Sequence, residues 1–152
     1  MISPELLRRY PLFAGQDYEM LKKMAMLAHK KEAEADTILF FEGEVAKTLY
    51  IVLDGGVTLT MNIGEIGEQR VESLEPLRDG EVVGWSALVA PYVYHLGAQT
   101  AEKTHLIAFE CVALRQLLDD NPVYGYYFMK ELTKVIGQRL ISKCTQLMSL
   151  LV

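Results

Sequence analysis

One short stretch of the chain concentrates side chains that could hold a small molecule. Trp85, Tyr92 and Tyr94 carry flat rings that could stack on an aromatic ligand, although aromatic side chains near a sheet also simply fill a core. His95 follows directly and could become cationic beside an anion, whereas a lone histidine on a strand is commonly structural. A binding role and a packing role therefore remain open for these residues.

The residue patterns of known catalytic and metal sites are missing from the sequence. The histidines His29, His95 and His105 lack the His-x-His spacing that a jelly-roll metal site needs. Cys111 and Cys144 are too far apart for a close-spaced metal pair, and there is no Gly-x-Ser-x-Gly elbow, Walker loop or Cys-x-x-Cys. We therefore expect a protein that is not an enzyme and that holds no metal ion or other cofactor.

Length and charge restrict the classes of protein further. The 152 residues, 51% of them hydrophobic, suffice for one sizeable core, so we expect a single domain over residues 1–152. The formal net charge of −5 lacks the basic surplus that binding to nucleic acid phosphates requires. No apolar run is long enough for the core of a signal peptide or for a membrane span. We expect a cytoplasmic protein that contacts neither nucleic acid nor membrane.

Helix signals open the chain. Ser3 followed by Pro4 can cap a short first helix, because a hydroxyl acceptor and a proline suit the first helical turn. Asp17 can cap a second helix, after which apolar residues recur at helical spacing. Residues 1–31 are therefore predicted as N-terminal helices.

The middle of the chain, residues 32–110, is predicted to be mainly sheet. From Ala35 onward, runs of β-branched and aromatic residues are separated by glycines that allow the chain to reverse. The first strands are expected to be sequential antiparallel neighbours, and a hairpin tip is expected at 64–67. The predicted strands are 37–41, 49–53, 57–61, 92–98 and 105–109.

The segment 111–152 is predicted to be helical, with a long last helix. Pro122 suits the start of that helix, and about thirty residues would span on the order of 45 Å, more than a small core can cover. Part of the apolar ridge is therefore expected to meet a second copy of the chain, although the ridge could instead pack back onto its own sheet. The residues expected at the dimer interface are Leu132, Ile136, Leu140 and Leu147.

The stretch 40–57, with Gly43 and Gly55 where strands must reverse, resembles the hairpin signature of the cyclic nucleotide-binding domain superfamily. This superfamily includes the catabolite activator protein and the regulatory domains of Crp/Fnr-like regulators. The turn at 12–15, the segment 79–84 and the terminal helix follow in the order of that family. The resemblance implies a mainly β fold: a double-stranded β-helix, or jelly-roll-like β-roll, with N-terminal helices and a long C-terminal helix.

The resemblance also implies a phosphate-binding cassette near 79–98. In the family, Gly-Glu opens a short helix whose amides meet a cyclic phosphate, while the glutamate accepts a ribose hydroxyl; Gly80 and Glu81 match, although this glutamate could equally be a helix-cap carboxylate. The family's arginine is missing, because no arginine lies between Arg78 and Arg115. The predicted ligand-binding residues are Gly80, Glu81, Val82, Val83, Gly84, Trp85, Ser86, Tyr92, Tyr94 and His95. The last three are the expected replacements for the arginine.

These observations predict a non-catalytic, effector-sensing regulatory module with a degenerate cassette, whose effector could be a cyclic nucleotide or another small molecule. In the family, ligand contacts reach the terminal helix through a hinge, here 119–124, and bias one dimer arrangement. Two alternatives remain: a ligand-free module for protein interaction and dimerisation, and the regulatory domain of a Crp/Fnr-type transcription regulator with a separate helix-turn-helix domain. Because the sequence stops at Val152 without such a domain, we expect a stand-alone sensor.

Overall fold

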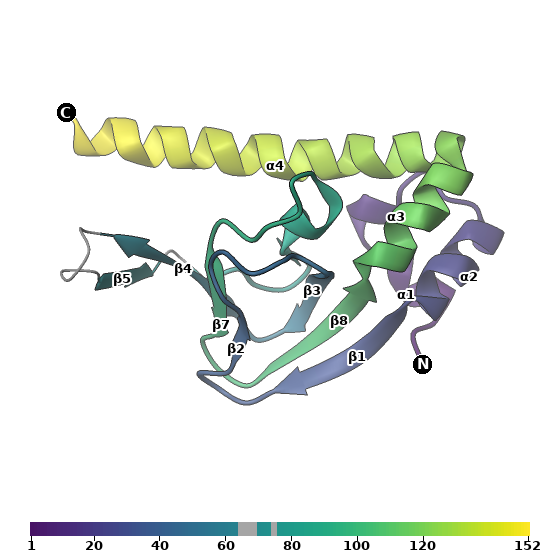
Figure 1. Cartoon of the computed structure of the whole chain (residues 1–152), viewed down its shortest axis with the longest axis horizontal. Coiled ribbons are helices and arrows are strands. Elements are labelled where there is room, and N and C mark those ends of the chain that lie inside the picture. Colours follow the sequence, from purple (N-terminus) through teal and green to yellow (C-terminus); the bar gives the residue numbers. More distant parts are fainter. Residues whose placement is uncertain (64–69, 74–75) are drawn as a thin grey trace.

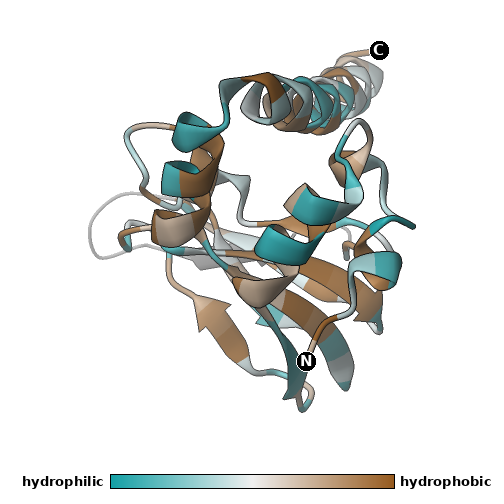
Figure 2. Cartoon of the chain, turned by 90° about the vertical axis from the view of Figure 1, so that its right-hand side faces the viewer, coloured by the Kyte–Doolittle hydropathy of each residue, from teal (hydrophilic) through white to brown (hydrophobic). Residues whose placement is uncertain are grey.

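Two antiparallel sheets occupy the centre of the molecule, with helices at one end and a long helix along one side (Figure 1). The structure is a computed structural model, and it describes residues 1–63, 70–73 and 76–152. Figure 2 shows that the strands carry long hydrophobic stretches, whereas the helices alternate hydrophobic and hydrophilic residues, as helices that cover a core do. The mainly β fold with helices at both ends of the chain, predicted from the resemblance, is confirmed.

Each sheet combines strands from distant parts of the chain. The first sheet consists of β1 (Ala28–Ala33), β3 (Thr48–Asp54), β6 (Val82–Val83) and β8 (Thr104–Glu110). The second sheet consists of β2 (Ile38–Phe40), β4 (Val57–Ile63), β5 (Arg70–Ser73) and β7 (Gly97–Thr100). Their spatial orders are β1-β8-β3-β6 and β2-β7-β4-β5.

The pairing of the strands differs from the sequential neighbours expected from the sequence. β2 pairs with β7 and not with β3, while β3 lies between β8 and β6. The expectation was wrong because β3 is buried over 49–52 and needs hydrogen-bonded partners along both edges, which return from later parts of the chain. The register places Leu49 opposite Phe109 and Ile51 opposite Ile107, so apolar pairs face each other across the sheet.

The β region begins earlier than predicted. Helix α2 (Tyr18–Met26) ends before Leu27, and β1 starts at Ala28, so the predicted boundary between helices and sheet near residue 31 was wrong. β1 is an edge strand that carries the run His-Lys-Lys-Glu, and such charges are a common way of protecting a sheet edge. Because its middle residues are polar, this strand lacks the apolar alternation by which a strand is recognised in a sequence.

The predicted strand 92–98 is mostly irregular. Tyr92 has a left-handed φ of 59°, Val93 forms an isolated bridge with Val45, and regular pairing begins only at Gly97, the first residue of β7. A left-handed residue cannot continue a strand, which explains the shorter element. The predicted hairpin tip at 64–67 lies outside the described residues.

Both predicted caps at the N-terminal end are present. In α1 (Pro4–Leu7), the Ser3 hydroxyl accepts a hydrogen bond from the Leu6 amide at 3.2 Å. In α2, the Asp17 carboxylate accepts one from the Met20 amide at 2.8 Å. Each cap satisfies an amide at the start of a helix, which has no partner within the helix itself. The short 3-10 helix η1 (Pro11–Phe13) connects the two.

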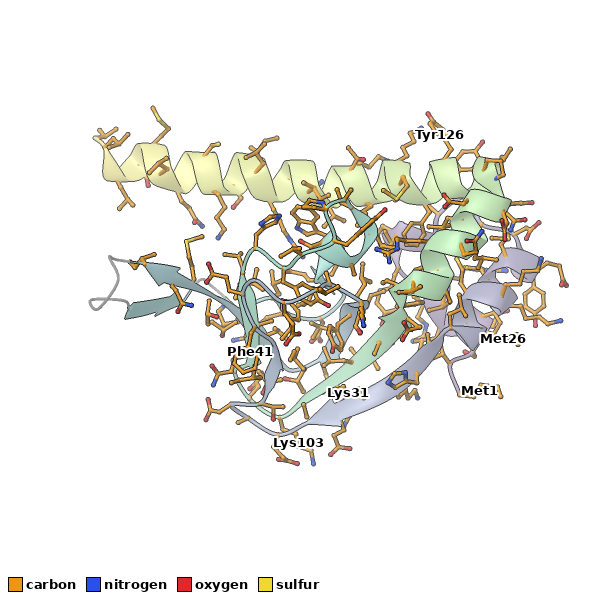
Figure 3. The ribbon with its side chains drawn as sticks, viewed as in Figure 1. Met1, Met26, Lys31, Phe41, Lys103 and Tyr126 are labelled. Carbon is orange, nitrogen blue, oxygen red and sulfur yellow. The ribbon has the colours of Figure 1, made fainter. Side chains whose placement is uncertain are left out.

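Helices α3 (Cys111–Asp120) and α4 (Pro122–Leu150) complete the chain. The start of α4 at Pro122 agrees with the prediction. In its first half Phe128 and Leu132 are fully buried, whereas every residue from 140 onward is exposed. Figure 3 shows Tyr126 on the side of α4 that faces away from the sheets. No helix among the described residues has the length and apolar character needed to cross a lipid bilayer.

The packing of α4 can be tested with two substitutions on the same helix. Leu132→Ala is expected to lower the free energy of unfolding by about 2–5 kcal/mol, because it removes a fully buried side chain and leaves a cavity. Lys130→Ala, at an exposed position, should change it by less than about 0.5 kcal/mol. Urea denaturation followed by circular dichroism measures both values. Equal effects of the two substitutions would contradict the packing of α4 against the body.

Candidate functional site

A cavity of about 520 Å³ lies between the sheets and α4. This volume is within the usual range for small-molecule sites, roughly 300–1,000 Å³. Its walls come from the connection at 10–12, from Ile51 and Leu59 on the strands, from the segment 76–82, and from one side of α4. The α4 residues on the wall are Glu131, Lys134, Val135, Gln138, Arg139, Ser142, Lys143 and Gln146.

The segment that contains Gly80 and Glu81 is held firmly against β3. The Gly80 amide donates to the Val52 carbonyl oxygen at 2.7 Å, and the Val52 amide donates to the Glu81 carbonyl oxygen at 3.0 Å. Gly80 has a φ of +83°, a left-handed conformation that side chains rarely adopt, which accounts for the glycine. The amides of Gly80 and Glu81 are both engaged within the protein, so they are not free donors for a ligand.

Of the ten predicted ligand-binding residues, three line this cavity: Gly80, Glu81 and Val82. Glu81 is exposed there, and Val82 belongs to β6. Val83, Gly84, Trp85 and Ser86 follow on a path that leads away from the cavity wall, into β6 and the 3-10 helix η2 (Trp85–Leu88). A side chain at Gly84 would meet the Thr48 carbonyl oxygen at 3.0 Å, so this glycine serves close packing.

The three residues expected to replace the arginine also lie away from the cavity wall. The Tyr94 hydroxyl donates to the Thr48 carbonyl oxygen at 2.6 Å, and its ring stacks on Phe40 with 3.7 Å between centroids. The Tyr92 ring is covered by the Arg115 guanidinium at 3.7 Å, while His95 is exposed. The tyrosines thus take the packing role that the sequence left open, because their partners for hydrogen bonding and stacking come from other elements.

Arg139 of α4 is a site residue that the sequence analysis missed. Its guanidinium donates a hydrogen bond to the carbonyl oxygen of Val82, the last residue of the segment 76–82, and both residues line the cavity. Burial lowers the pKa of the guanidinium, and the nearby Glu81 carboxylate acts in the opposite direction. A signal was available in the sequence: Arg139 follows Val135 by one helical turn, so a charged residue lies on the apolar ridge.

The four residues expected at a dimer interface fall into two groups. Leu132 is fully buried, so it belongs to the chain's own interior, and Ile136 packs partly against the same core. Leu140 and Leu147 are 63% and 58% exposed. The ridge is therefore covered by the chain's own core in the first half of α4 and is exposed from Leu140 onward.

The model of the family described as "Cyclic nucleotide-binding domain" matches residues 30–121. A solved structure of a candidate cyclic nucleotide-binding protein from Geobacter metallireducens has a TM-score of 0.81 and 28% identity, over 92% of this chain and 99% of that one. No functionally curated protein matches the chain.

Two further solved structures share the fold at lower identity. The catabolite activator protein of Thermus thermophilus has a TM-score of 0.70 and 22% identity, over 92% of this chain and 62% of that protein. The regulatory domain of Toxoplasma gondii PKA, solved with cAMP, has a TM-score of 0.71 and 16% identity, over 87% of this chain and 49% of that one. Within the described part of this chain, no group of three or more His, Cys, Asp or Glu residues could hold a metal ion.

The packing role of Tyr94 predicts a pH-dependent stability. Burial raises the pKa of Tyr94 to about 12 from 10.0, so the folded state keeps a proton that the unfolded state has lost between these two values. The stabilisation is complete below pH 10 and is lost as the pH rises towards 12. Tyr94→Phe should lower the free energy of unfolding by about 1–2 kcal/mol near neutral pH, because Thr48 loses its partner.

The same variant should lose less stability than the wild type between pH 10 and 12, since it no longer carries this titrating group. Urea denaturation at a series of pH values measures both effects. Tyr126→Phe, at an exposed position, is the matched control and should follow the wild type. An unchanged alkaline slope in Tyr94→Phe would show that the hydroxyl is not buried.

Proposed function

This chain belongs to the cyclic nucleotide-binding domain family, and on that premise we propose that it is a non-catalytic module that senses a small effector. The effector occupies the cavity between the segment 76–82 and α4. The observation that carries this proposal is the composition of the cavity wall: one side is tied to β3 by backbone hydrogen bonds, and the other is a helix. A ligand in contact with both sides changes the position of α4 if it binds one position more tightly than another.

The first probe of this site is a cyclic nucleotide, as the family membership suggests. Glu81 is placed to accept a hydrogen bond from a ribose hydroxyl, because its carboxylate is exposed on the cavity wall. Leu59, which is half-buried on the cavity wall, supplies apolar surface for a base or another flat group. The departure from the family is electrostatic, since the cassette segment itself carries no arginine after Arg78. Titration with cyclic nucleotides therefore decides whether the effector is a cyclic nucleotide or another small molecule.

The exposed part of α4 suggests how binding of an effector in the cavity is transmitted to a second copy of the chain. Leu140, Cys144, Leu147 and Leu151 recur at intervals of four and three residues, the spacing of a two-stranded coiled coil. All four are exposed, and they lie in the part of α4 that follows Arg139. We call these four residues the α4 stripe. In a parallel homodimer, the stripe of one copy packs against the stripe of the other. An effector that moves α4 then changes the geometry of a homodimer.

Binding is tested by calorimetric titration with cyclic AMP, cyclic GMP and cyclic dinucleotides. We expect saturable binding of at least one of them by the wild type, and at least tenfold weaker binding by Glu81→Gln, because the amide removes the charged acceptor. His95→Ala is the matched control: His95 is exposed away from the cavity wall and should leave the affinity unchanged. An absence of binding to all probes favours the alternative, a ligand-free module for protein interaction and dimerisation.

Dimerisation is tested by mass in solution. Light scattering should give twice the mass of 17.2 kDa for the wild type and the single mass for Leu147→Asp, because a buried carboxylate in the stripe opposes association. Ser149→Asp adds the same charge on the opposite side of α4 and should keep the dimer. A wild-type protein of single mass would refute the homodimer.

The orientation of the pair can be read from a cysteine on the stripe. In a parallel pair in register, Cys144 of each copy faces its counterpart, so oxidation with copper phenanthroline should give an interchain disulfide. Cys111 is fully buried and does not compete. Cys144→Ser should abolish the cross-link. A dimer by mass that does not cross-link would indicate antiparallel or out-of-register helices.

A further inference from the structure

Arg139 brings a positive charge to the cavity from α4. The cassette segment 79–98, on the other side of the cavity, contains no lysine or arginine. We infer that the cavity takes an effector with a compact anionic group, and that Arg139 binds this group. The inference rests on the proposed effector-sensing function and names the class of ligand and the residue that selects it.

Among the described residues, the charge of the cavity wall differs in sign from that of the chain. The chain has a formal net charge of −5, yet the charged residues on the described part of the wall are three cations, Lys134, Arg139 and Lys143, and two carboxylates, Glu81 and Glu131. Lys134 and Glu131 form an ion pair at 3.0 Å and neutralise each other. Arg139 and Lys143 then face Glu81, so this part of the wall keeps a surplus of one positive charge, which favours an anionic ligand.

Arg139 has hydrogen-bonding capacity to spare. A guanidinium carries five N–H donors, and within the described part of the chain the recorded acceptor is the Val82 carbonyl oxygen. A phosphate or carboxylate is a stronger acceptor than a carbonyl and matches the planar fork of the guanidinium with two parallel bonds. A half-buried cation also gains more from an anion than an exposed one does, because less water screens the pair. An anion in the cavity therefore competes well with Val82.

The position of Arg139 links this exchange to α4. Leu132 is buried and Ile136 packs partly against the core, whereas every residue after Arg139 is exposed. The bond to Val82 thus fastens the helix to β6 at Arg139, the last half-buried residue of α4. When an anion takes over the guanidinium, that fastening is exchanged for a contact through the ligand. The charge of the effector is in this way connected to the exposed segment 140–150.

Cyclic AMP, adenosine and inorganic pyrophosphate separate the contributions in a calorimetric titration of the full chain. Adenosine shares the base and sugar of cyclic AMP but lacks its phosphate, and pyrophosphate is a phosphate anion without base or sugar. For the wild type we expect binding of cyclic AMP at least tenfold tighter than of adenosine, weakening as sodium chloride is raised. Arg139→Gln should remove that preference, and Arg139→Lys should keep part of it, because it retains the charge without the fork.

Controls separate a loss of binding from a loss of folding. Arg78 is an exposed arginine in the segment 76–82 that does not line the cavity, and its side chain pairs with Glu102 at 3.0 Å. Arg78→Gln should therefore leave all three affinities within twofold. Circular dichroism and thermal unfolding establish that each variant is folded. If Arg139→Gln does not fold, Arg139→Lys takes its place in the test, because a smaller preference for cyclic AMP over adenosine can still be measured with that variant.

The outcomes distinguish this inference from the proposed function. Equal binding of cyclic AMP and adenosine by the wild type, weakened alike by Glu81→Gln, would overturn the anion site and leave the sensing proposal standing. Binding of pyrophosphate that depends on Arg139, without binding of either nucleoside compound, would support the anion site and remove cyclic nucleotides from the proposal. An absence of binding to all three would overturn both.

Discussion

An aromatic cluster joins the three regions on which the rest of the structure depends. The Phe13 ring, from the N-terminal connection, lies 5.5 Å from that of Phe109 at the end of β8 and 5.9 Å from that of Phe128 in α4. Phe109 and Phe128 are 96 and 115 residues away from Phe13 along the chain, so the cluster fixes how helices and sheets meet. With Leu132 buried one turn later, the direction of α4 across the molecule is set, and with it one wall of the cavity.

The two walls of the cavity are held in different ways. The segment around Gly80 is bonded through its backbone to Val52 in the middle of β3, a strand with partners on both sides. The helix wall is anchored at one end, and beyond Arg139 its residues are exposed. A rigid wall facing a helix that is packed along only part of its length is a suitable arrangement for converting occupancy into movement, because few buried contacts oppose the displacement of the exposed part.

The family membership and the local chemistry of this chain point to the same place but not to the same residues. Gly80 and Glu81 keep their positions on the cavity wall, whereas Tyr94 is buried against Phe40 and the strands. The positive charge comes from α4, through Arg139. In the proposed sensing mechanism, a cation on α4 couples ligand charge to helix position more directly than a cation on the opposite wall would, because the ligand-binding group then lies on the helix whose position changes.

The sequence by itself determined the features that depend on local chemistry. The Ser3 and Asp17 caps, the start of α4 at Pro122 and the core of β3 follow from hydrogen-bonding capacity, fixed proline geometry and apolar content, which neighbouring residues suffice to express. The tertiary structure alone decided which strands pair and which cation reaches the cavity. The spacing of Arg139 from Val135 places it on the apolar ridge, but its contact with Val82, 57 residues away, depends on how the whole helix packs against the sheets.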